Sequence, residues 1–238
     1  MNNLVATFFI FTTSSIGIAD SSIAREVTNS RIERNTTFIA VAQSKNVSRY
    51  LESGKIKEKQ RDFKGALADY NKAVSLDPKY GESYHVRGLF KYKRSDTAGA
   101  LIDLSKAISL DPKDANAYHD RATVKKGLRD FRGAMSDYNM AISINPKHPL
   151  SYNDRATLKA GEMSDFSGAL SDFNTAILIN SKDSFAYENR ANLKRLELND
   201  KAGAIEDFRQ AARLFRDEGK TQELQKVIKY LQGLGATE

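Results

Sequence analysis

The chain has 238 residues, a formal net charge of +7 at pH 7 and no cysteine. Without cysteine there is no disulfide, no thiolate metal site and no lipid-modified cysteine. The positive charge favours acidic protein partners, anionic membranes or nucleic acid, without choosing among them.

The N-terminal segment carries the signals for localisation. Residues 4–11 are apolar except for one threonine, and small residues at 17–19 offer a site for a signal peptidase. We expect residues 1–19 to be a cleaved secretory signal, with a retained anchor or a disordered tail as alternatives. Residues 20–46, rich in Ser, Thr, Asn and Arg, are typical of a disordered linker. Cleavage would make the protein secreted, periplasmic or lumenal, with no integral membrane span; otherwise it is membrane-anchored or cytoplasmic.

A sequence block recurs five times through residues 47–216. Its most regular mark is a tyrosine, and successive copies lie 34, 34, 34 and 35 residues apart, at Tyr50, Tyr84, Tyr118, Tyr152 and Tyr187. Self-similarity at this period is typical of stacked helical hairpins, which bury their hydrophobic faces against neighbouring copies. The chain is therefore predicted to be all-α, an α-solenoid, with repeats at 47–80, 81–114, 115–148, 149–183 and 184–216.

Each block contains the signals of two antiparallel helices. In the third block, Ala134, Tyr138 and Ala141 are spaced i, i+4 and i+7, which places them on one face of a helix. An aspartate three residues before a recurring glycine is placed to cap this second helix with its side chain. The predicted caps are Asp62, Asp96, Asp130, Asp165 and Asp200.

The second block shows the spacing of the recurring residues most clearly. These residues are Tyr84, Arg87-Gly88, Lys91, Ala100, Leu104, Ala107 and Pro112. This spacing resembles the tetratricopeptide repeat, in which aromatic, Leu-Gly, Tyr, Ala, Phe and Pro recur at those offsets. The resemblance implies a right-handed superhelix with a concave groove for segments of other proteins. Residues that stand at the same offset in successive repeats are called a column here. Two columns depart from the family pattern, because arginine stands where leucine is usual and lysine stands where tyrosine is usual.

The C-terminal segment, 217–238, lacks these columns. Its apolar residues recur at i, i+3, i+4 and i+7, at Leu224, Val227, Ile228 and Leu231. This pattern predicts a helix that caps the last hairpin and turns a polar face to water, followed by a tail. An amphipathic helix that binds a partner is the alternative.

Two further columns are charged. An aspartate recurs at Asp69, Asp103, Asp137, Asp172 and Asp207. We predict that each aspartate pairs with the arginine of the following block, because the first block has Ser53 in place of arginine and Asp69 would otherwise lack a partner. A lysine column, at Lys57, Lys91, Lys125, Lys159 and Lys194, either stabilises the C-terminus of each first helix or forms a basic stripe for an acidic partner.

The resemblance also implies which residues line the groove. His85 and His119 share one column, and neighbouring helices about 8 to 10 Å apart favour a polar ladder there over a shared metal ion. His148 is expected in a solvated loop. The predicted groove residues are Leu51, Lys55, Glu82, His85, Leu89, Tyr92, Asn116, His119, Thr123, Leu150, Asn153, Thr157, Phe185, Glu188 and Asn192.

The sequence contains no Gly-rich phosphate loop, nucleophile arrangement or metal-ligand cluster, so we predict no catalytic residue, metal or cofactor. We interpret the chain as a non-enzymatic scaffold or adaptor that binds a segment of a protein or peptide partner, with an acidic partner favoured by the charge. Two alternatives are RNA binding through a basic face and a role as a spacer or oligomerisation surface.

Overall fold

The structure is a computed structural model that describes residues 30–31 and 45–237. The chain divides into two compact units, residues 1–46 and residues 47–238. The predicted signal, and all of the predicted linker except residues 30–31 and 45–46, lie outside the described residues. None of the described helices is both long and apolar enough to cross a membrane.

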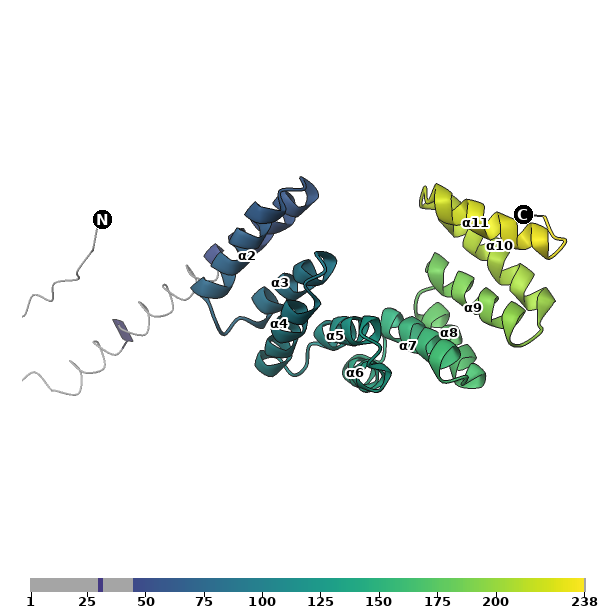
Figure 1. Cartoon of the computed structure of the whole chain (residues 1–238), viewed down its shortest axis with the longest axis horizontal. Helices are drawn as coiled ribbons and strands as arrows, with labels where there is room; N and C mark the ends of the chain where they lie inside the picture. Colours follow the sequence, from purple (N-terminus) through teal and green to yellow (C-terminus); the bar gives the residue numbers. More distant parts are fainter. Residues whose placement is uncertain (1–29, 32–44, 238) are drawn as a thin grey trace, which may run out of the picture. The chain divides into compact units, whose positions relative to one another are not determined.

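Helices alternate with short turns throughout residues 45–237, a range in which no strand occurs. The first helices of the hairpins are residues 45–59, α3 (Gly81–Lys93), α5 (Ala115–Gly127), α7 (Pro149–Glu162) and α9 (Ser184–Leu196). The second helices are α2 (Phe63–Leu76), α4 (Thr97–Leu110), α6 (Phe131–Ile144), α8 (Phe166–Ile179) and α10 (Lys201–Asp217). A last helix, α11 (Thr221–Gly233), follows them. The predicted all-α solenoid is confirmed (Figure 1).

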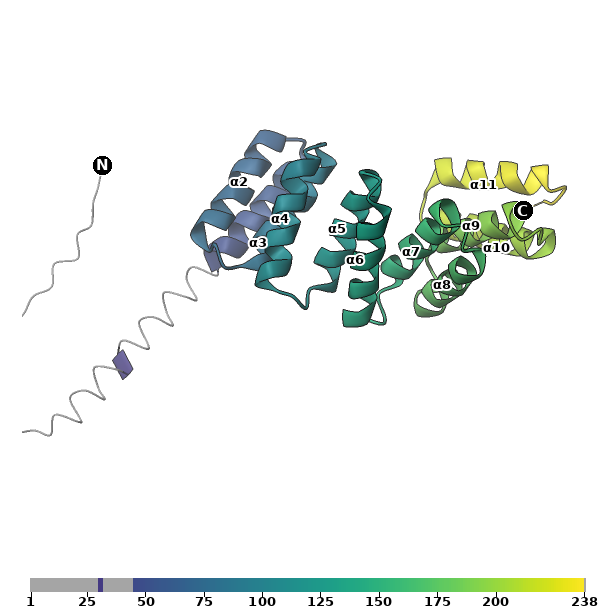
Figure 2. The ribbon, with the colours of Figure 1, turned by 60° about the horizontal axis from the view of Figure 1, so that its bottom comes forward.

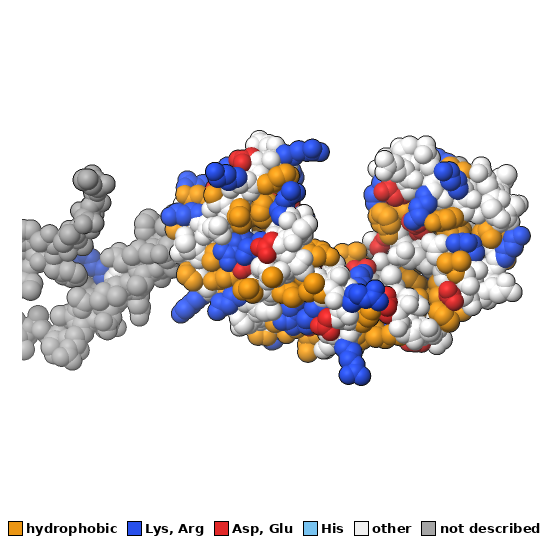
Figure 3. Space-filling model, viewed as in Figure 1, with side chains coloured by type: hydrophobic (Ala, Val, Ile, Leu, Met, Phe, Trp, Pro, Cys, Tyr) orange, Lys and Arg blue, Asp and Glu red, His pale blue; other side chains and the backbone are white. Residues whose placement is uncertain are grey.

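The hairpins stack in chain order, as Figure 2 shows. Each second helix from α4 to α10 packs most extensively against the first helix of its own hairpin and less extensively against the helix that follows it in the chain. The stack of repeats curves, and Figure 3 shows the hollow between its first and last hairpins. This architecture distributes the core along the stack, because each hairpin is stabilised by its neighbours and not by one central core.

The small-residue columns allow close packing around a large buried ring. The Tyr138 ring is fully buried against Ala122 and Ala134 of its own hairpin and Leu158 of the next. Leu104, Phe173 and Phe208 occupy the same position in other hairpins and are buried as well. The alanine and glycine columns therefore exist because side chains larger than a methyl group would separate the helices.

The aspartate caps are confirmed. Asp130 accepts a hydrogen bond from the Gly133 backbone N–H at 2.9 Å, and the other four caps accept from the equivalent glycines. A Cβ on Gly133 would lie 2.1 Å from the Asp130 carboxylate, so the cap requires glycine there. The residue before the cap, Arg129, has a φ of 63° and lets the chain reverse direction.

The predicted register of the arginine and aspartate columns is wrong. Arg121 Nε and Nη2 both donate to Asp137 of the same hairpin at 2.8 Å. The equivalent pairs are Arg87–Asp103, Arg155–Asp172 and Arg190–Asp207. Only the remaining nitrogen, Nη1, reaches the preceding hairpin, where it donates to Ser105 Oγ at 3.2 Å. The arginine therefore closes its own hairpin and also ties it to the one before.

The first hairpin explains why serine replaces arginine there. Asp69 accepts from Ser53 Oγ at 2.6 Å and lies 2.7 Å from Lys57 Nζ, so it has partners within its own hairpin. Within the described part of the chain, no second helix precedes residues 45–59 for an arginine to reach. The sequence hypothesis failed because it assumed that only an arginine could satisfy Asp69.

The lysine column is not a free basic stripe, so that one of its two predicted roles is wrong. Lys125 Nζ lies 2.8 Å from Asp137 Oδ2, and the other four lysines contact the aspartates of their own hairpins at 2.7 to 2.9 Å. In four of the five hairpins, the two departures from the tetratricopeptide pattern thus meet at one buried carboxylate. The lysines are held in these ion pairs and do not form a stripe of unpaired cations.

The last helix closes the stack. Val227 and Leu231 of α11 are buried in a cluster with Phe208 and Phe215 of α10. The Tyr230 ring lies 5.2 Å from the Phe208 ring. These contacts occupy the face of α10 that another repeat would otherwise cover.

Candidate functional site

All fifteen predicted groove residues lie on the first helices of the hairpins. They differ in exposure: Lys55, Glu82, Asn116, Leu150, Thr157 and Phe185 are exposed, whereas Leu51, His85, His119, Asn153 and Glu188 are buried. The remaining four, Leu89, Tyr92, Thr123 and Asn192, are half-buried. Four of the buried members, Leu51, His85, His119 and Asn153, contact the next first helix, and Glu188 contacts α11.

A polar ladder links α3, α5 and α7. His85 Nε2 donates to Asp120 Oδ2 at 2.6 Å, and His119 Nδ1 donates to the other oxygen of Asp120 at 3.1 Å. His119 Nε2 donates in turn to Asp154 at 3.0 Å. Because both nitrogens of His119 meet carboxylates, its imidazole is doubly protonated and cationic. The predicted ladder is thus present, and it joins three consecutive hairpins.

The ladder shifts the pKa values of its members. Burial alone would lower the pKa of His119, but the hydrogen bonds to Asp120 and Asp154 outweigh it and raise the pKa to about 9. The pKa of His85 rises to about 9 despite its burial, through Asp120 and Glu82. Burial would raise the pKa of Asp120, yet the two histidines lower it to about 2.

A pH dependence of stability follows from these histidines. A raised folded-state pKa means that their stabilisation is complete below pH 6.5 and is lost as the pH rises through about 9. We expect the free energy of unfolding to fall over this window, and the variant H85Q/H119Q to lose much of that slope. Urea unfolding followed by circular dichroism at several pH values measures it. Variant H148Q is the control, and equal slopes for the wild type and H85Q/H119Q would contradict the ladder's role.

His148 is not the solvated loop residue that the sequence predicted. It is buried as the N-cap of α7, where Nδ1 accepts from the Ser151 backbone N–H at 3.2 Å. Nε2 donates to Asn116 Oδ1 at 2.9 Å. Burial lowers its pKa, so the ring is neutral at pH 7. The two adjacent prolines suggested a solvated loop, but this imidazole replaces the aspartate that caps α5 and α9.

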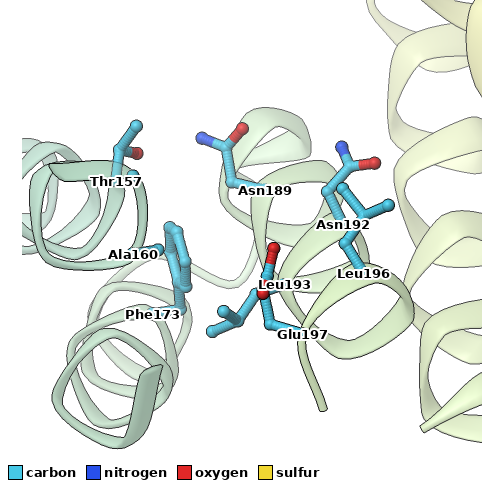
Figure 4. Close-up of a pocket in the computed structure, with 9 residues that line it drawn as sticks. Thr157, Ala160, Phe173, Asn189, Asn192, Leu193, Leu196 and Glu197 are labelled. Carbon is cyan, nitrogen blue, oxygen red and sulfur yellow. The ribbon is translucent and has the colours of Figure 1, made fainter. Parts of the chain in front are cut away.

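A pocket of ≈ 310 Å³ lies between α7 and α9, over α8. Figure 4 shows Phe173 of α8 between Thr157 and Ala160 on one side and the residues of α9 on the other. Leu193 completes an apolar floor, and the polar groups Asn189 and Asn192 lie along the α9 side. Two predicted groove residues, Thr157 and Asn192, are therefore brought together in one cavity.

Small residues open this pocket. Ala160 and Gly161 stand eight and nine residues after Tyr152. Eight residues after the repeated tyrosine, the second repeat has Tyr92 and the third has Lys126. Between α3 and α5 the Tyr92 side chain fills the corresponding slot and packs against Leu104 and Val124. By contrast, a Cβ on Gly161 would meet nothing within 4 Å. The pocket is thus a local consequence of two missing side chains.

The charge and hydrogen bonding of the pocket are asymmetric. Asn189 Nδ2 donates to Asn153 Oδ1 at 3.1 Å, while its own Oδ1 accepts no hydrogen bond from any described residue. Leu196, 61% exposed, and Glu197 form the rim. Glu197 is the pocket's single charged group and forms no ion pair within residues 45–237. The cavity therefore combines an apolar floor with unpaired oxygen acceptors.

The C-terminal end of the predicted groove is partly covered. Glu188 is 4% exposed and lies 2.7 Å from Lys226 Nζ of α11. The Phe185 ring contacts the Phe215 ring edge-on at 5.1 Å, and Lys220 Nζ lies 4.3 Å from the Phe185 ring centre. Glu188 is therefore closed off by α11, whereas Phe185 packs against α10 and remains 41% exposed.

Sequence reasoning missed several members of the site: Asp120, Asp154, Asn189, Ala160, Gly161, Leu196 and Glu197. The first three form one column, two residues after the repeated tyrosine, that contacts the histidine column of the preceding hairpin. The small side chain of Ala160 could have been noticed, because the other four repeats have Glu58, Tyr92, Lys126 and Arg195 at that offset. Among the residues that the structure describes, no cluster of three or more acidic or histidine side chains is arranged to hold a metal ion.

Comparisons with known proteins agree with this architecture. A family model described as "Tetratricopeptide repeat" matches residues 47–80. No curated protein sequence matches the chain. Yeast Tom70 is similar in structure, with a TM-score of 0.69 and 22% identity over 81% of this chain and 40% of that one. PilF of Pseudomonas aeruginosa has a TM-score of 0.67 and 12% identity over 81% and 93%.

A third solved structure is YrrB, which is described as a tetratricopeptide protein with an unusual peptide-binding site. Its TM-score is 0.54, at 18% identity over 78% of this chain and 98% of that one. At these identities the likenesses concern the fold.

Proposed function

The chain is a tetratricopeptide-repeat protein, and we propose that it is a non-enzymatic scaffold that binds a segment of a partner protein on the groove face of its first helices. The observation that carries this proposal is the pocket between α7 and α9. It is lined by residues of the groove columns, and its volume of ≈ 310 Å³ suits one side chain of an extended or helical segment.

Three features support a protein ligand over a reaction. This fold is generally a non-catalytic scaffold. The raised histidine pKa values arise from a ladder in which each imidazole is already bonded to carboxylates of neighbouring helices. The one hydroxyl that lines the pocket, Thr157 Oγ1, donates to the Asn153 backbone oxygen at 2.9 Å and is not paired with a general base. Peptide binding is also described for YrrB, which shares the fold.

The nucleic-acid alternative has no observation in its favour. The positive net charge suggested it, but the lysines of the repeated column are paired with aspartates. Of the two aromatic residues placed at groove positions, Tyr92 packs against Leu104 and Val124, and Phe185 packs against Phe215. Neither ring is free to stack on a base.

Filling the pocket tests the proposal. Variant A160Y copies the side chain that fills the slot between α3 and α5, so it is compatible with the stack. We expect peptides selected from a random display library on the wild-type chain to bind A160Y at least about tenfold more weakly. Fluorescence anisotropy with the labelled peptides measures this loss.

Variant A202Y is the matched control, because Ala202 is exposed on α10 outside the pocket. Its affinity should equal that of the wild type. The proposal fails if the selection yields no binding peptide, or if A160Y and A202Y bind the selected peptides equally well.

A further inference from the structure

The pocket between α7 and α9 carries a single charge at its rim. Glu197 is exposed, and no lysine, arginine or histidine lines the pocket beside it. The nearest cations along the chain are occupied, since Lys194 lies 2.9 Å from Asp207 and Arg195 lies over the Tyr230 ring at 5.2 Å. A ligand in the pocket would therefore meet an uncompensated carboxylate.

The position of Glu197 has no explanation in helix stability. It is the C-cap of α9, where the helix dipole disfavours a negative charge. Glu162 stands at the same offset in the fourth repeat, at the end of α7, but it does not line the pocket. The two glutamates thus stand at equivalent helix ends, and Glu197 alone of the two lines the cavity.

The neutral polar groups of the pocket also favour a donor on the ligand. The Asn189 Oδ1 accepts nothing from the described residues, and Thr157 Oγ1 donates to Asn153 at 2.9 Å, which leaves its lone pairs free. Below them lie the Phe173 ring and Leu193. A ligand side chain with an aliphatic part and a cationic end group would fit this pocket. Its aliphatic part would pack on the apolar residues, and its cationic group would donate to an oxygen acceptor.

We infer that the pocket recognises a lysine or arginine side chain of the partner segment, so that the preferred partner is basic there and not acidic. The inference rests on the proposed function, because it names the residue that the pocket selects. The stem packs on Phe173, Leu193 and Leu196, the charged tip pairs with Glu197, and Asn189 Oδ1 is left to accept from another donor of the partner segment. An acidic side chain in the same place would face the Glu197 carboxylate.

The test uses peptide pools with random flanks and one fixed central residue, either Lys, Arg, Met or Glu, titrated against the full chain. We expect the Lys and Arg pools to bind more tightly than the Met pool and the Glu pool to bind most weakly. Variant E197Q should weaken the Lys and Arg pools about tenfold and leave the Met pool unchanged. Variant E197K should reverse the preference toward the Glu pool.

Variant E162Q is the control and should behave as the wild type with every pool. If the Lys, Arg and Met pools bind equally and E197Q changes none of them, the inference is overturned while the proposed function stands, provided that A160Y still blocks binding. If no pool binds the wild-type chain, the proposed function fails with it. Circular dichroism spectra of the variants establish that each one is folded.

Discussion

Variant D137A is expected to lose about 3 to 5 kcal/mol of stability, as are the equivalent deletions at Asp103, Asp172 and Asp207. The Asp137 carboxylate is 4% exposed and accepts from Arg121 at 2.8 Å on both oxygens and from Lys125 at 2.8 Å. Its removal leaves two cations between packed helices with no counter-charge. Those hydrogen bonds also lower the pKa of Asp137 against the effect of burial, so this stabilisation is lost as the pH falls below 3.8. Urea unfolding at pH 7 measures the loss.

The same column supplies the control. Asp69 is paired with one cation, Lys57, and with the neutral Ser53, so D69A should cost less than D137A. A double-mutant cycle tests the register directly. Arg121 and Asp137 should show a coupling of about 1 kcal/mol or more, whereas Arg121 and Asp103 should show almost none. Strong coupling between Arg121 and Asp103 would restore the pairing between successive repeats.

Variant L231A is expected to cost about 2 to 5 kcal/mol, because Leu231 is 1% exposed in the cluster that α11 forms with Phe208 and Phe215. In a stack of nearest neighbours, the damage should be local. Hydrogen exchange should therefore accelerate in α9, α10 and α11, while α3 and α4 keep their protection.

Variant L234A is the comparison, because Leu234 is half-buried at the edge of the same cluster and should cost less. Uniform acceleration of exchange across all hairpins after L231A would show that the stack unfolds as one unit. An unchanged exchange rate in α9 would show that α11 does not close the stack.

Much of this fold could be predicted from the sequence, because its determinants are local. The tyrosine period gives the number of hairpins. The aspartate caps could be placed within single turns, since a capping side chain and its glycine are three residues apart. Gly133 is required because a side chain there would clash with the capping Asp130 carboxylate, and Ala122 is small because it packs against the Tyr138 ring. Both contacts involve residue types that recur in each copy.

The contacts between columns could not be predicted with the same success. Asp137 lies 16 residues after Arg121 and 18 residues before Arg155, and these similar separations do not say which of the two arginines shares its helix face. In the structure, Asp137 pairs with Arg121, the arginine of its own hairpin. The pocket depends on the small size of Ala160 and Gly161. Neither residue has a reactive or hydrogen-bonding side chain, so a sequence analysis that looks for such side chains does not select them.

The central claim is that a partner side chain enters the pocket between α7 and α9. The chain has no cysteine, so variant G161C carries a unique thiol, at a position where a Cβ meets nothing within 4 Å. Gly233 on α11 is equally open, and G233C is the matched control. The decisive measurement is the alkylation rate of each thiol with and without a saturating library-selected peptide. We predict that the peptide slows alkylation of G161C and not of G233C, whereas an unchanged rate at G161C would contradict binding in this pocket.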